Sequence, residues 1–241
     1  MKFAEPKNLE WTDELVSRFW AYHARTPEVY FTQKLGDRIV LRLRKYFRAK
    51  ENILDYGCGV GSLLHHLLQF DCRVTGVDFS KESVAQTAKL LGGRQNFMGA
   101  FTIKEIVRRK SQFDAIFMIE VIEHLNDHYL SETIENIGKL LAPGGVLMIT
   151  TPNDEDLESN TVYCPSCNSR FHNTQHMRTW NAESLSQFVQ RSGLSVVTTF
   201  TTDFTLSFRR KPLWFVFNEL LYGLRRRKRP HLVCVAERAM P

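Results

Sequence analysis

Two cysteines and two histidines lie within a short stretch of the C-terminal half of the chain. Cys164 and Cys167 form a Cys-Pro-Ser-Cys turn, and His172 and His176 follow with three residues between them. A C-x-x-C turn presents two thiolates from one knuckle, and histidines at this spacing are ligand-like. We therefore expect these four residues to hold Zn²⁺. The alternatives are two buried thiols without metal, or a knuckle completed by a residue such as His124.

A second group of residues suited to chemistry surrounds a glycine-rich turn. Residues 53–61 read Ile-Leu-Asp-Tyr-Gly-Cys-Gly-Val-Gly, and Asp78 lies 21 residues after the first of these glycines, Gly57. Glycines let the backbone approach a nucleotide closely, and an acid at the end of the next strand can bind ribose hydroxyls. Asp55, just before the turn, suits a cationic ligand better than a pyrophosphate. A dinucleotide site of a dehydrogenase is the alternative.

Alternating strands and helices must position these residues. Strands are predicted at 52–56, 72–77, 95–98, 113–119, 146–150, 194–200 and 231–236. Helices are predicted at 10–24, 30–48, 63–70, 80–91, 127–141 and 182–191, with Ser80 as an N-cap and with Pro143-Gly144-Gly145 ending the fifth. This alternation is typical of a doubly wound sheet, in which ligands bind beyond the carboxyl ends of the strands.

The predicted fold is therefore α/β, with a Rossmann-like, doubly wound and mostly parallel seven-stranded sheet. We expect N-terminal helices and a C-terminal inserted helix. Residues 1–50 are predicted to form a helical cap, and residues 51–241 the main domain. Within that domain we expect a Cys/His loop at 160–178 and a basic aromatic helix at 208–230.

Four stretches resemble class I methyltransferases that use S-adenosylmethionine (SAM). They span residues 53–64, 74–80, 113–125 and 140–153, in the order found in that family. The resemblance implies a SAM site formed by Asp55, Gly57, Gly59 and Gly61 around the methionine moiety, Asp78 on the ribose, Phe79 beside the adenine, and Glu120 and Val121 lining the donor pocket. Four motifs at the correct spacing favour this interpretation over a dehydrogenase.

The segment Glu120-Val121-Ile122-Glu123-His124 follows the strand predicted at 113–119. It is similar to the E-x-x-E-H segment of two O-methyltransferase groups, one of ubiquinone biosynthesis and one that methylates the 2′-hydroxyl of small RNA. The resemblance implies that Glu120, Glu123 and His124 hold a divalent metal such as Mg²⁺. The RNA group adds a histidine downstream, for which His172 and His176 are candidates. Without metal, His124 would be a catalytic base assisted by Glu123, or both residues would simply open the next helix.

The positive charge of the chain is concentrated near its C-terminus. The net charge is +6, and the eight basic residues at 209–211 and 225–229 exceed it, so the rest of the chain carries −2. Apolar and aromatic residues fill the space between these clusters. Such a segment suits a helix lying on an anionic membrane. A helix covering the active site is the alternative, and the acidic body argues against a nucleic-acid partner.

The remaining features favour a cytoplasmic protein. The N-terminus lacks a signal-peptide pattern, no apolar run approaches the roughly 20 residues of a membrane span, and the five cysteines show no disulfide spacing. Peripheral contact with the inner face of the membrane through 208–230 is compatible with this location. We expect a SAM-dependent O-methyltransferase acting on a hydroxyl of a small or lipid-linked acceptor. The alternatives are an RNA 2′-O-methyltransferase and a SAM-binding regulatory module without turnover.

Overall fold

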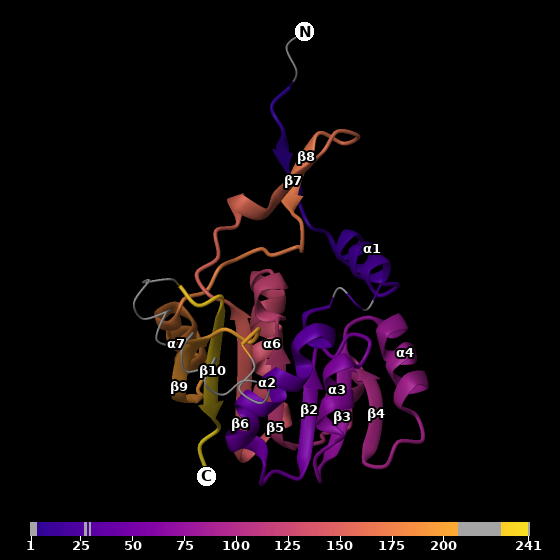
Figure 1. The fold of residues 1–241 in the computed structure, drawn as a ribbon, viewed down its shortest axis with the longest axis vertical. Coiled ribbons are helices and arrows are strands. Elements are labelled where there is room, and N and C mark those ends of the chain that lie inside the picture. Colours follow the sequence, from indigo (N-terminus) through magenta and orange to yellow (C-terminus); the bar gives the residue numbers. More distant parts are fainter. Residues whose placement is uncertain (1–3, 27, 29, 207–227, 241) are drawn as a thin grey trace.

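A seven-stranded sheet forms the centre of the protein, and the computed structural model describes residues 4–26, 28, 30–206 and 228–240. The strand order is β4-β3-β2-β5-β6-β10-β9, with β10 antiparallel to both of its neighbours and the other pairs parallel (Figure 1). The strands are β2 (Asn52–Tyr56), β3 (Arg73–Asp78), β4 (Phe97–Thr102), β5 (Phe113–Ile119), β6 (Leu141–Pro152), β9 (Ser195–Thr202) and β10 (His231–Glu237). The predicted α/β, mostly parallel seven-stranded sheet is confirmed.

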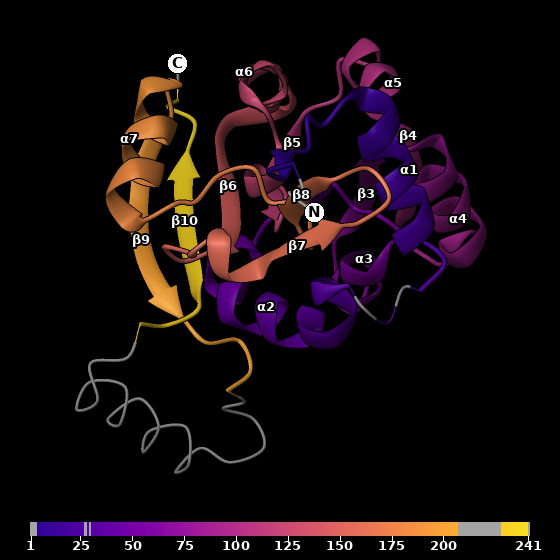
Figure 2. The same ribbon diagram turned by 90° about the horizontal axis from the view of Figure 1, so that it is seen from above.

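Helices cover both faces of this sheet, as the view from above shows (Figure 2). They are α2 (Phe31–Phe47), α3 (Ser62–Leu67), α4 (Lys81–Leu91), α5 (Ile103–Arg108), α6 (Asp127–Leu140) and α7 (Ala182–Arg191). Helix α1 (Asp13–His23) instead lies beyond the carboxyl ends of the strands and buries no residue (Figure 1). Buried side chains of α2, α3 and α4 form one core with the sheet, and those of α5, α6 and α7 form the other. The predicted basic aromatic helix at 208–230 lies, except for its last three residues, outside the described part of the chain.

Local capping explains why two of these helices begin just beyond the carboxyl ends of strands. The Ser80 side chain accepts a hydrogen bond from the Ser83 backbone N–H at 3.1 Å, which confirms the predicted N-cap of α4. Asn126 caps α6 in the same way, accepting from the Tyr129 backbone N–H at 2.9 Å. These caps fix the chain direction next to the sheet edge where ligands bind in such folds.

A second, three-stranded sheet stands beyond the carboxyl ends of the parallel strands (Figure 1). It contains β1 (Lys7–Asn8), β7 (Thr161–Cys164) and β8 (Ser169–His172) in the order β1-β8-β7. We predicted a loop over 160–178, but β-branched and aromatic residues on both sides of a short turn form a hairpin here. The N-terminal β1 pairs in parallel with β8, and Trp11 packs edge-on against Phe171.

Other differences from the sequence prediction concern element boundaries. Helix α6 ends at Leu140, and Pro143-Gly144-Gly145 lies within β6 rather than between a helix and a strand. The short helix α5 was not predicted, although Thr102 and Glu105 form a complete capping box at its start. Among the described residues, no helix has the length and apolar character needed to cross a membrane.

Candidate active site

The glycine-rich turn after β2 depends on backbone conformations that favour glycine. Gly57, Gly59 and Gly61 have φ values of 84°, 52° and 83°. A Cβ atom on Gly57 would lie 2.5 Å from Cγ2 of Val121, which follows β5. The structure therefore brings the predicted turn against Val121, and a larger residue at position 57 would not fit beside it.

Asp78 is the last residue of β3 and lies beside the glycine turn. Its buried carboxylate accepts hydrogen bonds from the backbone N–H groups of Gly59 and Ser80, both at 2.9 Å. Burial raises the pKa of Asp78 to about 6, although these hydrogen bonds oppose the shift. The next residue, Phe79, keeps half of its side chain exposed and offers an aromatic surface beside this acid. The pair fits the predicted contacts with ribose and adenine.

Asp55 is a buried acid of this crevice with one carboxylate oxygen that lacks a partner among the described residues. Its Oδ2 atom has no hydrogen-bond partner among the described residues. Burial raises the pKa of Asp55 to about 8, and the nearby charge of Asp78 adds to the shift. A buried carboxylate oxygen without a donor fits a ligand that carries a positive charge, as SAM does.

Tyr30 is a residue of the crevice that the sequence did not reveal. Its ring lies across the glycine turn, 3.5 Å from where a Cβ atom of Gly59 would be. Burial and the charge of Asp78 raise the pKa of Tyr30 to about 12. Tyr30 belongs to no motif and precedes α2, so only the folded chain places it beside Asp78.

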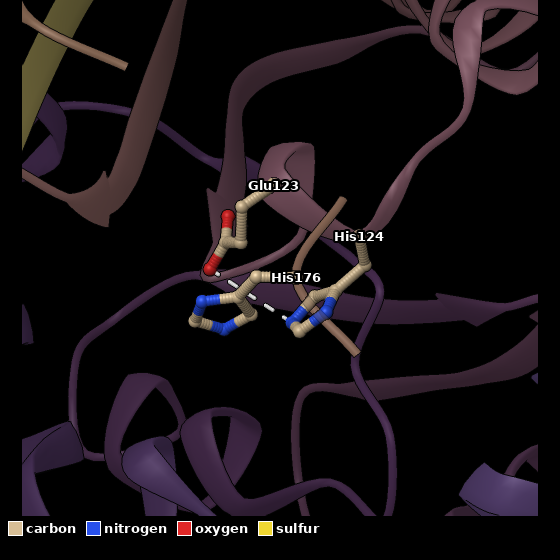
Figure 3. Close-up of side chains that lie close together, drawn as sticks. All are labelled: Glu123, His124 and His176. Atoms are coloured by element: carbon tan, nitrogen blue, oxygen red, sulfur yellow. Dashed lines mark ion pairs between the residues drawn. The ribbon is translucent and has the colours of Figure 1, made fainter. Parts of the chain in front are cut away.

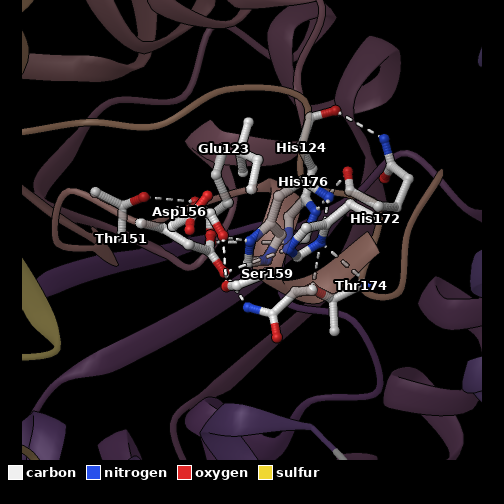
Figure 4. Close-up of polar contacts among 12 residues, drawn as sticks. Glu123, His124, Thr151, Asp156, Ser159, His172, Thr174 and His176 are labelled. Atoms are coloured by element: carbon white, nitrogen blue, oxygen red, sulfur yellow. Dashed lines mark hydrogen bonds and ion pairs between the residues drawn. The ribbon is translucent and has the colours of Figure 1, made fainter. Parts of the chain in front are cut away.

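A second cluster begins directly after β5. Glu120, with a left-handed φ of 52°, is followed by Glu123 and His124 in the short 3-10 helix η2 (Ile122–His124). Neighbouring residues of β6 hold both acids. Thr150 donates to Glu120 at 2.8 Å. Thr151 donates to Glu123 at 3.0 Å (Figure 4). The adjacent strand therefore fixes the side chains of the predicted E-x-x-E-H segment.

Burial controls the charges of this cluster. It raises the pKa values of Glu120 and Glu123, and the charge of Glu120 raises that of Glu123 further. It also lowers the pKa of His124 to about 3, with a further contribution from His176. The imidazole of His124 is therefore neutral at physiological pH and keeps a lone pair that can bind a metal.

His176 joins the cluster from the segment after β8. The Met177 backbone N–H donates to the Glu123 carbonyl oxygen at 2.9 Å and holds this segment against η2. The ring centroids of His124 and His176 lie 4.8 Å apart, and one ligand atom each of Glu123, His124 and His176 lies within 4.8 Å of the others (Figure 3).

This donor set fits a divalent cation. The buried Oε1 atom of Glu123 has no hydrogen-bond partner among the described residues and lies 3.8 Å from Nε2 of His124. An orphaned carboxylate oxygen beside neutral imidazoles is a suitable environment for Mg²⁺, Mn²⁺ or a similar ion.

Gln175 holds His124 in place and was not predicted from the sequence. Its backbone oxygen lies 3.4 Å from Nδ1 of His124, and its side-chain amide donates to the His124 carbonyl oxygen at 3.1 Å. Its side-chain oxygen accepts from the Trp20 indole N–H at 2.9 Å, which ties α1 to the cluster. Gln175 has a left-handed φ of 62° and is completely buried.

The structure does not bring the four predicted zinc ligands together. Cys164 pairs with Ser169 across the hairpin, whereas His172 pairs with Thr161. Three residue pairs, on the order of 10 Å, separate Cys164 from His172 along the hairpin. The prediction of one zinc ion held by Cys164, Cys167, His172 and His176 is therefore corrected.

Each half of the predicted zinc site has other partners in the structure. Hydrogen bonds with Ser169 and Cys164 lower the pKa of the exposed Cys167 thiol at the tip of the hairpin. His172 and His176 instead face Glu155, which follows β6. Glu155 was not predicted from the sequence.

An open hollow of about 250 Å³ lies over the histidines. Its lining includes Leu9, Trp11, Glu158, Arg170, Phe171 and Met177, together with His172 and His176. Arg170 and Glu158 form an ion pair at 3.1 Å, so the hollow presents this pair together with aromatic surface. It gives a ligand access to the histidine side of the cluster.

Comparisons with known proteins agree with this geometry. Residues 23–199 match a family model described as a methyltransferase domain. Over 157 residues the chain is 30% identical to the ubiquinone biosynthesis O-methyltransferase of Nitrosococcus oceani, covering 62% of this chain and 63% of that protein. Over 192 residues it is 28% identical to the small RNA 2′-O-methyltransferase of Arabidopsis thaliana, covering 70% of this chain but 20% of that protein. The chain therefore spans less than two thirds of either relative.

A solved structure shares the fold. The 1,6-didemethyltoxoflavin-N1-methyltransferase of Burkholderia thailandensis, with bound S-adenosylhomocysteine, superimposes with a TM-score of 0.65 at 14% identity. The match covers 97% of this chain and 94% of that chain. Because the family model spans the crevice of β2, β3 and β5 as well as the E-x-x-E-H segment, the chain belongs to the class I SAM-dependent methyltransferases.

Proposed function

We propose that the protein transfers the methyl group of SAM to a hydroxyl oxygen of a small or lipid-linked acceptor. The observation that carries this proposal is the meeting of Glu123, His124 and His176 in one place. Val121, which abuts Gly57 of the cofactor turn, lies between Glu120 and Glu123 in the sequence. Donor crevice and cluster are therefore neighbours, as a transfer between two bound molecules requires.

The chemistry of the acceptor explains why such a cluster would be present. The methyl group of SAM is already activated, but a hydroxyl must lose its proton before it attacks. The residues that would hold a divalent cation are Glu123, His124 and His176, whereas Glu120 accepts from Thr150 and lies outside this group. When bound, such a cation lowers the pKa of a hydroxyl that it contacts. Because its lowered pKa of about 3 makes His124 a weak base, its lone pair suits a cation better than a proton.

Other residues of the chain orient this machinery. Thr150 and Thr151 hold the two carboxylates from β6. The backbone oxygen of Gln175 contacts Nδ1 of His124, and Nε2 of the same ring faces Glu123. The ring of Trp20 lies edge-on to His124 at 4.9 Å and shields it from water. An acceptor would enter through the hollow that Trp11 and Phe171 line.

RNA 2′-O-methylation is the second candidate, and His176 specifically favours it. The small-RNA group resembled by this sequence adds a downstream histidine to the E-x-x-E-H segment, and His176 lies where such a residue would act. A regulatory module that binds SAM without turnover is the third candidate. The buried, preorganised cluster supports an enzyme instead.

Labelled SAM distinguishes these candidates. The protein would be incubated with isotopically labelled SAM and Mn²⁺, in parallel with quinol precursors, with a lipid extract and with small RNA. We expect label in the small-molecule or lipid fraction, and none with Glu123→Gln. Label in RNA alone would establish the second candidate. Intact SAM binding without transfer to any fraction would contradict both and favour the regulatory module.

Contact with an anionic membrane through 208–230 remains part of the proposal on the basis of the sequence. Co-sedimentation with liposomes that contain an anionic lipid should fall when this segment is removed. Equal binding to liposomes of anionic and of neutral lipid would contradict this part of the proposal. Binding that survives the deletion would contradict it as well.

A further inference from the structure

A carboxylate lies between the two histidines that were expected to bind zinc. Glu155 Oε2 lies 2.5 Å from Nδ1 of His176, and Glu155 Oε1 lies 3.3 Å from Nε2 of His172. The three side chains are 15%, 11% and 4% exposed, respectively. We propose that Glu155 and His172 are positioning residues that orient His176 toward Glu123 and His124. This inference rests on the cation site of the proposed function.

Hydrogen bonds fix the tautomer of His172. Its Nδ1 atom accepts from the backbone N–H groups of Thr174 and His176, each at 3.3 Å, and lies 3.0 Å from the Thr174 hydroxyl (Figure 4). An imidazole nitrogen that accepts hydrogen bonds has no proton of its own, so the proton of neutral His172 is on Nε2. That nitrogen lies 3.3 Å from Oε1 of Glu155 but completes no hydrogen bond to it, so His172 acts on His176 through the stacked rings.

The proton of His176 is on the nitrogen that faces Glu155. Because Glu155 is a hydrogen-bond acceptor, Nδ1 of His176 carries the hydrogen and Nε2 keeps its lone pair. The ring of His176 stacks on that of His172 with centroids 4.4 Å apart and planes 15° apart, which fixes its orientation. A carboxylate behind a ligating histidine is the arrangement that sets ring direction and raises ligand basicity in metal sites.

A second cation between Glu155, His172 and His176 is the competing interpretation, since their ligand atoms also lie within 4.8 Å of one another. The tautomer of His172 argues against it. To bind a cation through Nε2, His172 would have to move its proton to Nδ1, where two backbone N–H groups already point. We therefore infer one cation per chain, with Glu155 outside its ligand set.

Titration calorimetry of the full chain with Mn²⁺ tests this inference. Wild-type protein should bind one equivalent. Glu155→Gln should still bind one equivalent, but with an affinity roughly 10- to 100-fold lower, as for loss of other supporting residues. The matched control is Glu158→Gln, an exposed acid on the same segment whose partner is Arg170, and its Mn²⁺ affinity should equal that of wild type. Affinity for S-adenosylhomocysteine should be unchanged in both variants. This measurement shows that both variants are folded.

Co²⁺ separates a positioning residue from a ligand. If Glu155 lies outside the ligand set, the visible absorption bands of the Co²⁺-loaded protein should keep their positions in Glu155→Gln and shift in His176→Ala. Unchanged Mn²⁺ affinity in a Glu155→Gln protein that binds S-adenosylhomocysteine would overturn this inference and leave the proposed function intact. Two equivalents in wild type, one of them lost in Glu155→Gln, would make Glu155 a ligand. A wild-type protein that binds no Mn²⁺ would overturn the inference together with the cation site.

Discussion

The cofactor crevice and the cation cluster lie at the same end of one sheet but are built in different ways. The crevice comes mainly from one stretch, from Asp55 to Phe79, and its shape is set by backbone turns. The cluster joins η2 to a segment 51 residues further along the chain, and side-chain hydrogen bonds hold it. Local turns are specified by short sequence patterns, whereas the cluster depends on tertiary packing. We therefore expect a substitution in one region to leave ligand affinity in the other unchanged.

Removal of a cation ligand should have the largest effect and should be confined to the cluster. Glu123→Gln replaces the orphaned buried carboxylate, so Mn²⁺ affinity should fall by more than the roughly 100-fold that marks loss of a supporting residue. Calorimetry with S-adenosylhomocysteine should give an affinity within about threefold of wild type, because no donor-site residue is altered. A parallel loss of both affinities would show that the two regions are one unit.

The reciprocal change acts on the crevice. Asp78→Ala removes a carboxylate whose charge-assisted hydrogen bonds are worth about 1.5–3 kcal/mol each, so SAM affinity should fall roughly 10- to 100-fold. Mn²⁺ affinity should be unaffected. Unchanged SAM affinity by calorimetry would refute the assignment of the cofactor site itself.

The charge of Asp55 makes cofactor binding depend on pH. In the free protein, burial keeps Asp55 protonated below a pKa of about 8, and the positive charge of SAM favours its ionised form. Binding therefore lowers this pKa and releases a proton, so affinity should rise with pH up to about 8, by at most tenfold per pH unit, and then level off. Calorimetry in two buffers of different ionisation enthalpy measures the proton release. Asp55→Asn should remove it.

Gly57→Ala tests how strictly the turn requires glycine. A positive φ costs an alanine about 1–2 kcal/mol, and the new Cβ would also meet Val121, so the Tm should fall by roughly 2–8 °C. Gly138→Ala is the control, because nothing lies within 4 Å of its Cβ position in α6. That variant should raise the Tm slightly by improving helix propensity. Equal shifts in the two variants would contradict the steric argument.

The smallest effect is expected at the hairpin tip. Because the hairpin holds Cys164 and Cys167 away from the histidines, replacing both with serine should leave Mn²⁺ and SAM affinities unchanged within error. A clear loss of Mn²⁺ affinity in this double variant, measured by calorimetry, would restore a site that includes the cysteines.

The same contrast explains what the sequence predicted well. The seven strands, the Ser80 cap and the glycine turn are local features, and each was found, although β4 and β6 extend beyond their predicted bounds. The E-x-x-E-H segment was also found, because a strand delivers it to the sheet edge. In each of these cases the signal and the structure occupy the same few residues.

Residues that depend on tertiary contacts were missed. Gln175 and Trp20 meet across 155 positions, and no local pattern marks either of them. The Cys-Pro-Ser-Cys spacing was misleading because two cysteines on either side of a tight turn also suit a β-hairpin, and here strand pairing separates them from His172. Glu155 was missed because its role depends on the tautomers of two histidines that the hairpin brings to it.

The N-terminal segment touches both regions. Trp20 donates to Gln175 behind His124, and Tyr30, at the start of the next helix, lies over Gly59 of the cofactor turn. Two aromatic residues ten positions apart in the sequence thus lie beside the cofactor turn and beside the cluster. Thermodynamic linkage then sets a strict condition: any factor by which Mn²⁺ changes the affinity for S-adenosylhomocysteine must equal the factor by which S-adenosylhomocysteine changes the affinity for Mn²⁺. Trp20 and Tyr30 are where such cooperativity between the two ligands would be transmitted.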